Sequence, residues 1–91
     1  MLIPLAERGY AQAQCYIASM HQLGLGVSVD GRKAVKWYTQ AAKQEIKEEF
    51  ISAIAYNNLA TIYIVGTPGI LPDRKRAEKY RQKARKLGFK M

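Results

Sequence analysis

The sequence predicts an all-α protein made of two copies of a helix–turn–helix unit. Three observations lead to this prediction. Apolar residues recur with a helical period, pairs of glycines interrupt the periodic segments, and the second half of the chain repeats the order of the first. Glycine ends a helix readily because it adopts left-handed backbone angles without a steric penalty.

The first unit begins with an amphipathic helix over residues 11–23. Its expected packing side carries Tyr10, Ala13, Ile17 and Met20. Gly24 and Gly26 end this helix, and Asp30 is a favourable N-cap for a second helix that runs to about Gln44. The second helix is expected to present its small and aromatic side chains to the first: Ala34, Trp37, Tyr38 and Ala41.

The second unit repeats this order with a helix from about Phe50 to Val65, a turn at 66–69 and an N-cap at Asp73. The corresponding positions share a residue or a residue class: Ala11 and Ala53, Ala13 and Ala55, Gly24 and Gly66, Asp30 and Asp73, Ala34 and Ala77, Trp37 and Tyr80, Ala41 and Ala84. Small alanines at facing positions allow paired helices to approach closely. The last helix is expected to pack through one narrow side: Ala77, Tyr80, Ala84 and Leu87.

Residues 11–44 resemble a Sel-one-like repeat (SLR), a relative of the tetratricopeptide repeat. The stretch AQAQCYIASMHQLGLGVSVDGRKAVKWYTQAAKQ follows the pattern A-x-A-Q…G-x-G-V-x-x-D…K-A-x-x-W-Y-x-x-A-A without a gap. The copy at 53–89 departs from it by one inserted residue in the glycine loop and by Tyr80, Arg81 and Arg85 in place of tryptophan, tyrosine and alanine. Residues 45–52 make the joint about six residues longer than usual in the family, which we interpret as an extra turn on the next helix.

The resemblance implies an α/α superhelix, a short solenoid of stacked helical pairs that forms one domain over residues 1–91. Residues 1–9 would be the end of a partial repeat, 11–45 repeat one, and 53–89 repeat two with a basic C-terminal helix. The resemblance also implies a non-enzymatic adaptor or scaffold that binds other proteins, with the first helix of each repeat lining a concave face. We expect an uncharged groove for a peptide or helix there, lined by Gln12, Tyr16, Ser19, Ile54, Asn58 and Thr61.

Side chains that could perform chemistry are sparse, so no enzymatic activity, cofactor or metal site is expected. His21 is the only histidine, at a position where the family usually has tyrosine, and we expect a packed, hydrogen-bonded ring. Cys15 is the only cysteine and has no basic neighbour to activate its thiol. One residue of each kind makes neither a convincing metal site nor a Cys–His pair.

The net charge of +8 lies entirely in the last eighteen residues. Residues 1–73 carry six basic and six acidic side chains, whereas 74–91 carry nine basic residues and one acid, Glu78. The basic residues surround the last helix: Arg74, Lys75, Arg76, Lys79, Arg81, Lys83, Arg85 and Lys86. A terminal repeat needs a polar outer surface, but cations at a helix N-terminus and like charges four residues apart oppose helix formation. Because this arrangement opposes the helix without a visible local gain, we predict that the surface has a function and docks an acidic partner.

Three partners compete for this basic surface. An acidic protein is favoured by the resemblance; one candidate is a toxin or secreted effector held inactive, which would make the chain an immunity or effector-binding protein. Nucleic acid is the alternative, although the basic side of the helix has no aromatic residue and no helix-turn-helix or RNA-binding signature is visible. A membrane surface is disfavoured because the apolar side is narrow and needed for packing.

The chain as given has no apolar stretch near the roughly 20 residues that a membrane span requires, and its first residues do not resemble a signal peptide. With a single cysteine, this favours a cytoplasmic location. Two repeats are close to the minimum that buries a continuous core. We therefore expect a fragment of a longer array, a homo-oligomer stacked end to end, or a domain stabilised by its partner.

Overall fold

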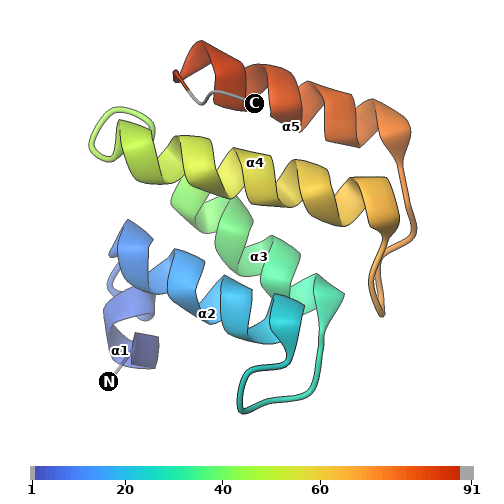
Figure 1. Ribbon diagram of the computed structural model, residues 1–91. Helices are drawn as coiled ribbons and strands as arrows, with labels where there is room; N and C mark the ends of the chain where they lie inside the picture. The colour runs from blue at the N-terminus through green and yellow to red at the C-terminus, as the bar shows by residue number, and fades with distance from the viewer. Residues whose placement is uncertain (1, 89–91) are drawn as a thin grey trace.

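The computed structural model describes residues 2–88, which form five α-helices and no strand. The helices are α1 (Leu2–Glu7), α2 (Ala11–Leu23), α3 (Gly31–Ala42), α4 (Glu49–Val65) and α5 (Arg74–Lys86). Each helix packs on the next in chain order, and α2 also touches α4, so that helical hairpins stack side by side (Figure 1). The predicted all-α solenoid is therefore confirmed. None of these helices combines the length and apolarity needed to cross a bilayer.

The two hairpins, α2–α3 and α4–α5, share the same N-cap geometry, although their loops begin differently: Gly24 has a ψ of 37° and Gly66 a ψ of 166°. Asp30 and Asp73 have nearly identical backbone angles, with φ of −146° and −150° and ψ of 98° in both. Each side chain accepts a hydrogen bond of 3.1 Å from the backbone N–H three residues later. The backbone N–H of Asp30 donates to the carbonyl of His21 at 2.9 Å, and that of Asp73 donates to the carbonyl of Tyr63 at 2.7 Å. The two N-caps predicted from the sequence are thus confirmed.

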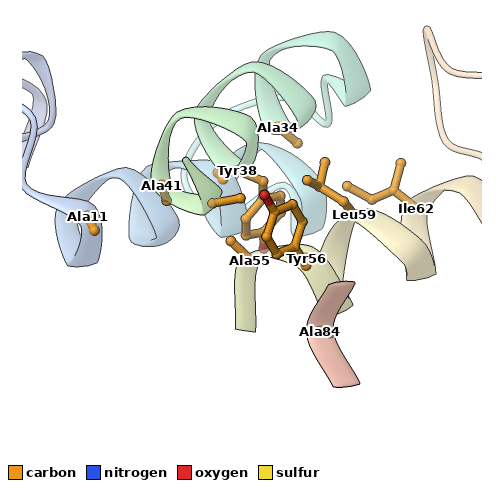
Figure 2. Packing of buried hydrophobic residues seen from close by; sticks show 11 residues of the cluster. Ala11, Ala34, Tyr38, Ala41, Ala55, Tyr56, Leu59, Ile62 and Ala84 are labelled. Atoms are coloured by element: carbon orange, nitrogen blue, oxygen red, sulfur yellow. The ribbon is translucent and has the colours of Figure 1, made fainter. Parts of the chain in front are cut away.

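The main core lies where α2, α3 and α4 meet, and Tyr38 is at its centre (Figure 2). Tyr38 is fully buried, and its hydroxyl donates to Oε1 of Gln22 at 2.7 Å and lies 2.7 Å from Oγ of Ser19. The rest of the cluster consists mainly of alanines and α4 side chains: Ala11, Ala18, Ala34, Ala41, Ala42, Ala55, Tyr56, Leu59, Ile62 and Ala84. The alanines leave the room that the tyrosine ring and the branched side chains fill.

The helix α1 is attached to repeat one by side-chain amides as well as by apolar contact. Ala6 packs with Ala13 and Ile17 of α2, and the half-buried ring of Trp37 packs against this cluster. The buried side chain of Gln14 donates from Nε2 to the carbonyl of Ala6 at 3.0 Å. These contacts hold the short helix α1 against α2.

Three local expectations need correction. Tyr10 precedes α2 as its N-cap residue, so its side chain leaves the packing side and is 58% exposed. The second helix ends at Ala42; Gln44 lies beyond it and its amide donates to the carbonyl of Gly9 at 2.7 Å. The expected hydrogen bond of His21 is absent within residues 2–88, where its buried Nδ1 has no partner. The imidazole is shorter than Tyr63, its counterpart in repeat two, whose hydroxyl reaches a side chain of α5.

The long joint between the repeats is part turn and part helix. Residues 45–47 form a turn, and α4 begins at Glu49, four residues before Ala53, the counterpart of Ala11. As a result α4 has 17 residues and α2 has 13, so the extra helical turn is confirmed but accounts for only half of the joint. The hydroxyl of buried Ser52 donates to the carbonyl of Ala42, which ties the start of α4 to the end of α3.

Candidate partner-binding surfaces

A groove of about 380 Å³ runs between α2 and α4, the first helices of the two repeats. It brings together five of the six side chains predicted for the concave face, with three others: Gln12, Cys15, Tyr16, Ser19, Met20, Leu25, Ile54 and Asn58. Thr61, the sixth predicted residue, does not line the groove. It is exposed one turn further along α4, where its hydroxyl donates to the carbonyl of Asn57 at 3.2 Å.

The chemistry of this α2–α4 groove is apolar and uncharged. Tyr16 is 59% exposed and offers its ring to solvent, whereas the hydroxyl of Ser19 is engaged with Tyr38 in the core. Burial of the Cys15 thiol raises its pKa to about 11. Since the thiolate is the reactive form, this side chain is a poor nucleophile at neutral pH. The groove is thus suited to contact by shape and apolar area, with few fixed polar anchors.

A second hollow of about 420 Å³ continues the groove towards α1. It shares Gln12 and Tyr16 with the first and adds Leu5, Tyr10 and Glu48 at its edges. Sequence reasoning missed these three residues, because Tyr10 and Glu48 lie in joints between helices and Leu5 lies in a helix of only six residues. Helical periodicity therefore carries no signal for them. Together the two hollows share Gln12 and Tyr16 and form one surface along α2.

The narrow packing side predicted for α5 is confirmed. Ala77 and Ala84 are buried against α4, and Tyr80 and Leu87 pack at the margin of the core. The side chain of Tyr80 lies between Tyr56 and Tyr63 of α4 in a stack with ring centroids 5.9 Å apart on both sides. Partial burial raises the pKa of the Tyr80 hydroxyl. These contacts fix the rotation of α5 and hence the direction of each basic side chain.

Two of the eight basic residues lie over this tyrosine stack. The guanidinium of Arg76 lies 5.4 Å from the ring centroid of Tyr63 and donates to its hydroxyl at 3.2 Å, which raises the pKa of the arginine. The ammonium of Lys83 lies 5.3 Å from the ring centroid of Tyr56. Cations over aromatic faces are attracted by the ring quadrupole. These two long side chains are therefore held along α4 rather than projecting freely.

Arg74, Arg81 and Arg85 follow the opposite edge of α5, the edge directed away from α3. Their spacing of seven and four residues places them on one helical stripe, with Glu78 between the first two. Arg74 and Arg81 line a hollow of about 300 Å³ together with Ile64, Ala77 and Glu78. The remaining cations, Lys75, Lys79 and Lys86, are exposed, and Lys79 lines with Lys83 a hollow of about 260 Å³ that faces α3.

Few of these charges are neutralised. Within residues 2–88 only two ion pairs form, Arg76 with Asp73 at 3.8 Å and Arg81 with Glu78 at 3.9 Å. The other six cations of α5 have no carboxylate within ion-pair distance in that part of the chain: Arg74, Lys75, Lys79, Lys83, Arg85 and Lys86. No group of three potential metal ligands occurs among the described residues.

The Sel1 repeat family model matches residues 11–45 and 53–89. Chitin synthase regulatory factor 3 of Schizosaccharomyces pombe is 38% identical over 68 residues, which cover 74% of this chain and 7% of that protein. Among solved structures, a protective antigen present in uropathogenic Escherichia coli strains, displaying an SLR fold, matches with a TM-score of 0.81 and 26% identity. That match covers 92% of this chain and 17% of the antigen, so the chain spans a small part of each of these proteins.

Proposed function

This chain belongs to the Sel1 repeat family, and from that premise we propose that it is a non-enzymatic protein–protein interaction module that docks an acidic protein partner through α5. The observation that carries the proposal is the single-sign surface of this helix. Eight cations surround it, six of them without a carboxylate partner in the described chain, although packing uses only one narrow side.

The isolated chain loses stability by this arrangement. Arg74, Lys75 and Arg76 occupy the first turn of α5, where the helix dipole favours acids. Like charges four residues apart, such as Lys75 and Lys79, each oppose the helix by roughly 0.2–0.5 kcal/mol. Solubility alone is satisfied by mixed charges. An acidic partner removes the repulsion and is also steered to the surface during diffusional encounter.

The α2–α4 groove supports the same class of function. Its lining is apolar and uncharged, with the exposed ring of Tyr16 on one wall and Ile54 on the other. Such a groove suits a peptide or helix that inserts apolar side chains. We propose it as the second contact of the module, with α5 supplying orientation and the groove supplying buried apolar area.

A regulatory role is the specific form of the proposal. One relative is named as a regulatory factor of an enzyme. By analogy, the acidic partner would be a toxin or secreted effector that this chain holds inactive, as an immunity or effector-binding protein. Nucleic acid is the competing ligand, favoured by the concentration of positive charge. It is disfavoured because the aromatic rings nearest the cations, Tyr56, Tyr63 and Tyr80, stack on one another and are not free to stack on bases.

The test compares two charge-reversal variants in an affinity isolation followed by binding measurements on the purified partner. The first variant changes Arg74, Lys75, Arg76 and Lys79 to glutamate. The matched control changes four exposed cations elsewhere to glutamate: Arg8, Arg32, Lys33 and Lys47. Circular dichroism verifies that both remain helical.

We expect the first variant to lose at least about tenfold in affinity, and the control to keep its affinity to within about threefold. Affinity should also fall as salt is raised, and duplex DNA should not displace the partner. Equal recovery of the partner by both variants would discard electrostatic docking through α5. Displacement by DNA would favour the nucleic-acid alternative.

A further inference from the structure

The two repeats differ most at the helix edge that would carry a following repeat. In repeat one, α3 packs on α2 with one side and on α4, the start of repeat two, with another (Figure 1). In repeat two, α5 holds the corresponding position next to α4. The N-caps Asp30 and Asp73 lie 43 positions apart, and the same shift maps each residue of α3 onto one of α5. The edge of α5 can therefore be compared residue by residue with one that already carries a neighbour.

The edge of α3 is fitted closely to repeat two. The backbone N–H of Gly31 donates to the carbonyl of Pro68 at 2.8 Å, and a Cβ at Gly31 would come to 2.6 Å from that oxygen and would also overlap the side chain of Thr67. Further along, Tyr38 is fully buried, and the carbonyl of Ala42 accepts the hydroxyl of Ser52. Small or apolar residues thus occupy these three points of contact with repeat two.

Each of these positions carries a charge in α5. Arg74 replaces Gly31, Glu78 replaces Val35, Arg81 replaces Tyr38 and Arg85 replaces Ala42. A helix that stacked on α5 as α4 stacks on α3 would bury three guanidinium groups, of which only Arg81 has a carboxylate partner in the described chain. Burying charges without partners is strongly unfavourable. The charged edge of α5 is therefore unsuited to packing against an apolar helix of the kind that packs on α3.

The shape of a helix-binding edge nevertheless remains. The hollow of about 300 Å³ lies where the following helix would lie, and it is lined by apolar Ile64 and Ala77, by Arg74 and Arg81, and by Glu78, which pairs with Arg81. Ile64 is 43% exposed, whereas its counterpart in repeat one is Gln22, whose side chain is engaged with Tyr38. Apolar side chains beside an excess of arginines are complementary to a helix that offers one apolar residue flanked by acids.

We propose that this α5 edge, defined by Arg74, Ala77, Arg81 and Arg85 with Ile64, binds an acidic amphipathic helix of the protein partner in the position that α4 takes on α3. The inference rests on the proposed function and deepens it by naming the element of the partner and the three arginines that receive it. A second copy of this chain is a poor occupant, because no helix within residues 2–88 carries more than one acidic residue.

The test uses a synthetic 17-residue peptide, the length of α4, designed as a helix with one leucine flanked by glutamates on one face. A second peptide has lysine in place of every glutamate. Binding to the whole chain is measured by fluorescence anisotropy at roughly physiological ionic strength, where the Debye length of about 8 Å screens charges outside the contact. The arginine variant changes Arg74, Arg81 and Arg85 to glutamate. A comparison variant changes Lys75, Lys79 and Lys86, exposed cations of the same helix that do not line this hollow, to glutamate.

We expect the glutamate peptide to bind and the lysine peptide not to bind. The arginine variant should lose at least about tenfold in affinity, and this loss should exceed that of the lysine variant, which removes the same charge from the docking helix, by at least about threefold. Because charge reversal perturbs Glu78 as well, a variant with glutamine at the three arginines serves as a second measurement, and it should lose at least about fivefold. Ile64→Glu should also weaken binding, because it places an acid at the apolar centre.

Equal losses in the arginine and lysine variants would overturn the inference, since attraction by net charge would then explain binding. If the lysine variant alone lost binding, docking through α5 would stand and only its assignment to this edge would fall. If neither variant weakened binding of an acidic peptide or of the isolated partner, both proposals would fall. Tighter binding of duplex DNA than of the peptide would identify the surface as a nucleic-acid site.

Discussion

Replacing Gly31 with alanine tests how closely repeat two is packed on repeat one. Gly31 begins α3 and is buried beneath the loop of repeat two. An added methyl group would meet the carbonyl oxygen of Pro68 at 2.6 Å and Cγ1 of Ile70 at 2.9 Å, besides overlapping Thr67. Atoms at such distances cannot coexist, so the loop must move away from α3.

The expected cost follows from three contributions. Overpacking a close contact costs about 1–3 kcal/mol. Movement of the loop also weakens the hydrogen bond from Gly31 to Pro68, which contributes about 1 kcal/mol. Alanine regains at most about 1 kcal/mol through its higher helix propensity. The net loss in the free energy of unfolding should therefore be about 1–3 kcal/mol, equivalent to roughly 4–8 °C in Tm for each kcal/mol.

Equilibrium unfolding in urea, followed by circular dichroism, measures this loss. Arg74→Ala is the matched control, because it is the corresponding position at the start of α5 and its side chain is exposed in the described chain. Its effect should stay within about 0.5 kcal/mol. A Gly31→Ala protein as stable as the parent chain would refute the close stacking of the two repeats. It would also remove the basis for comparing the edges of α3 and α5.

Two further predictions concern single side chains. Asp30→Ala and Asp73→Ala each remove an N-cap and should each lower the free energy of unfolding by about 1 kcal/mol in the same urea assay. Asparagine at either position should restore most of this loss. An unchanged urea midpoint for both alanine variants would contradict the cap assignment. Burial raises the pKa of the Cys15 thiol from 9.0 to about 11. Because only the thiolate reacts, this thiol should react with iodoacetamide about a hundredfold more slowly at about pH 8 in the folded chain than in urea. Equal rates in both states would contradict its burial.

Much of the fold follows from local sequence signals. The N-caps at Asp30 and Asp73 were predictable because an aspartate side chain satisfies an N–H three residues ahead whatever surrounds it. The narrow apolar side of α5 follows equally from its helical period. Positions just outside helices were less predictable. Tyr10 and Gln44 were assigned by helical period to segments where the period no longer applies, and their contacts depend on neighbouring elements.

The candidate surfaces were only partly predictable, for the same reason. Aligning the repeats placed five of six side chains in the α2–α4 groove, since equivalent positions on stacked helices share a side. Thr61 falls outside because the groove ends at Asn58 on α4, and how far two helices line one groove is determined by tertiary packing. The hollow edged by Leu5, Tyr10 and Glu48 could not be predicted, because tertiary packing brings the end of α1 and the joint after it next to the distant joint before α4.

By itself, the sequence determined the helical repeat, its caps and the placement of nearly all the net charge on one helix, because periodicity, capping and charge are properties of residues and their near neighbours. Only the tertiary structure decided which way each charge faces. Stacking of Tyr80 between two rings of α4 sets the rotation of α5, so that Arg76 and Lys83 lie over tyrosines while Arg74, Arg81 and Arg85 lie along the free edge. Likewise, position 31 requires glycine because a loop some forty residues away in the chain packs against it. The local sequence around Gly31 does not predict that contact.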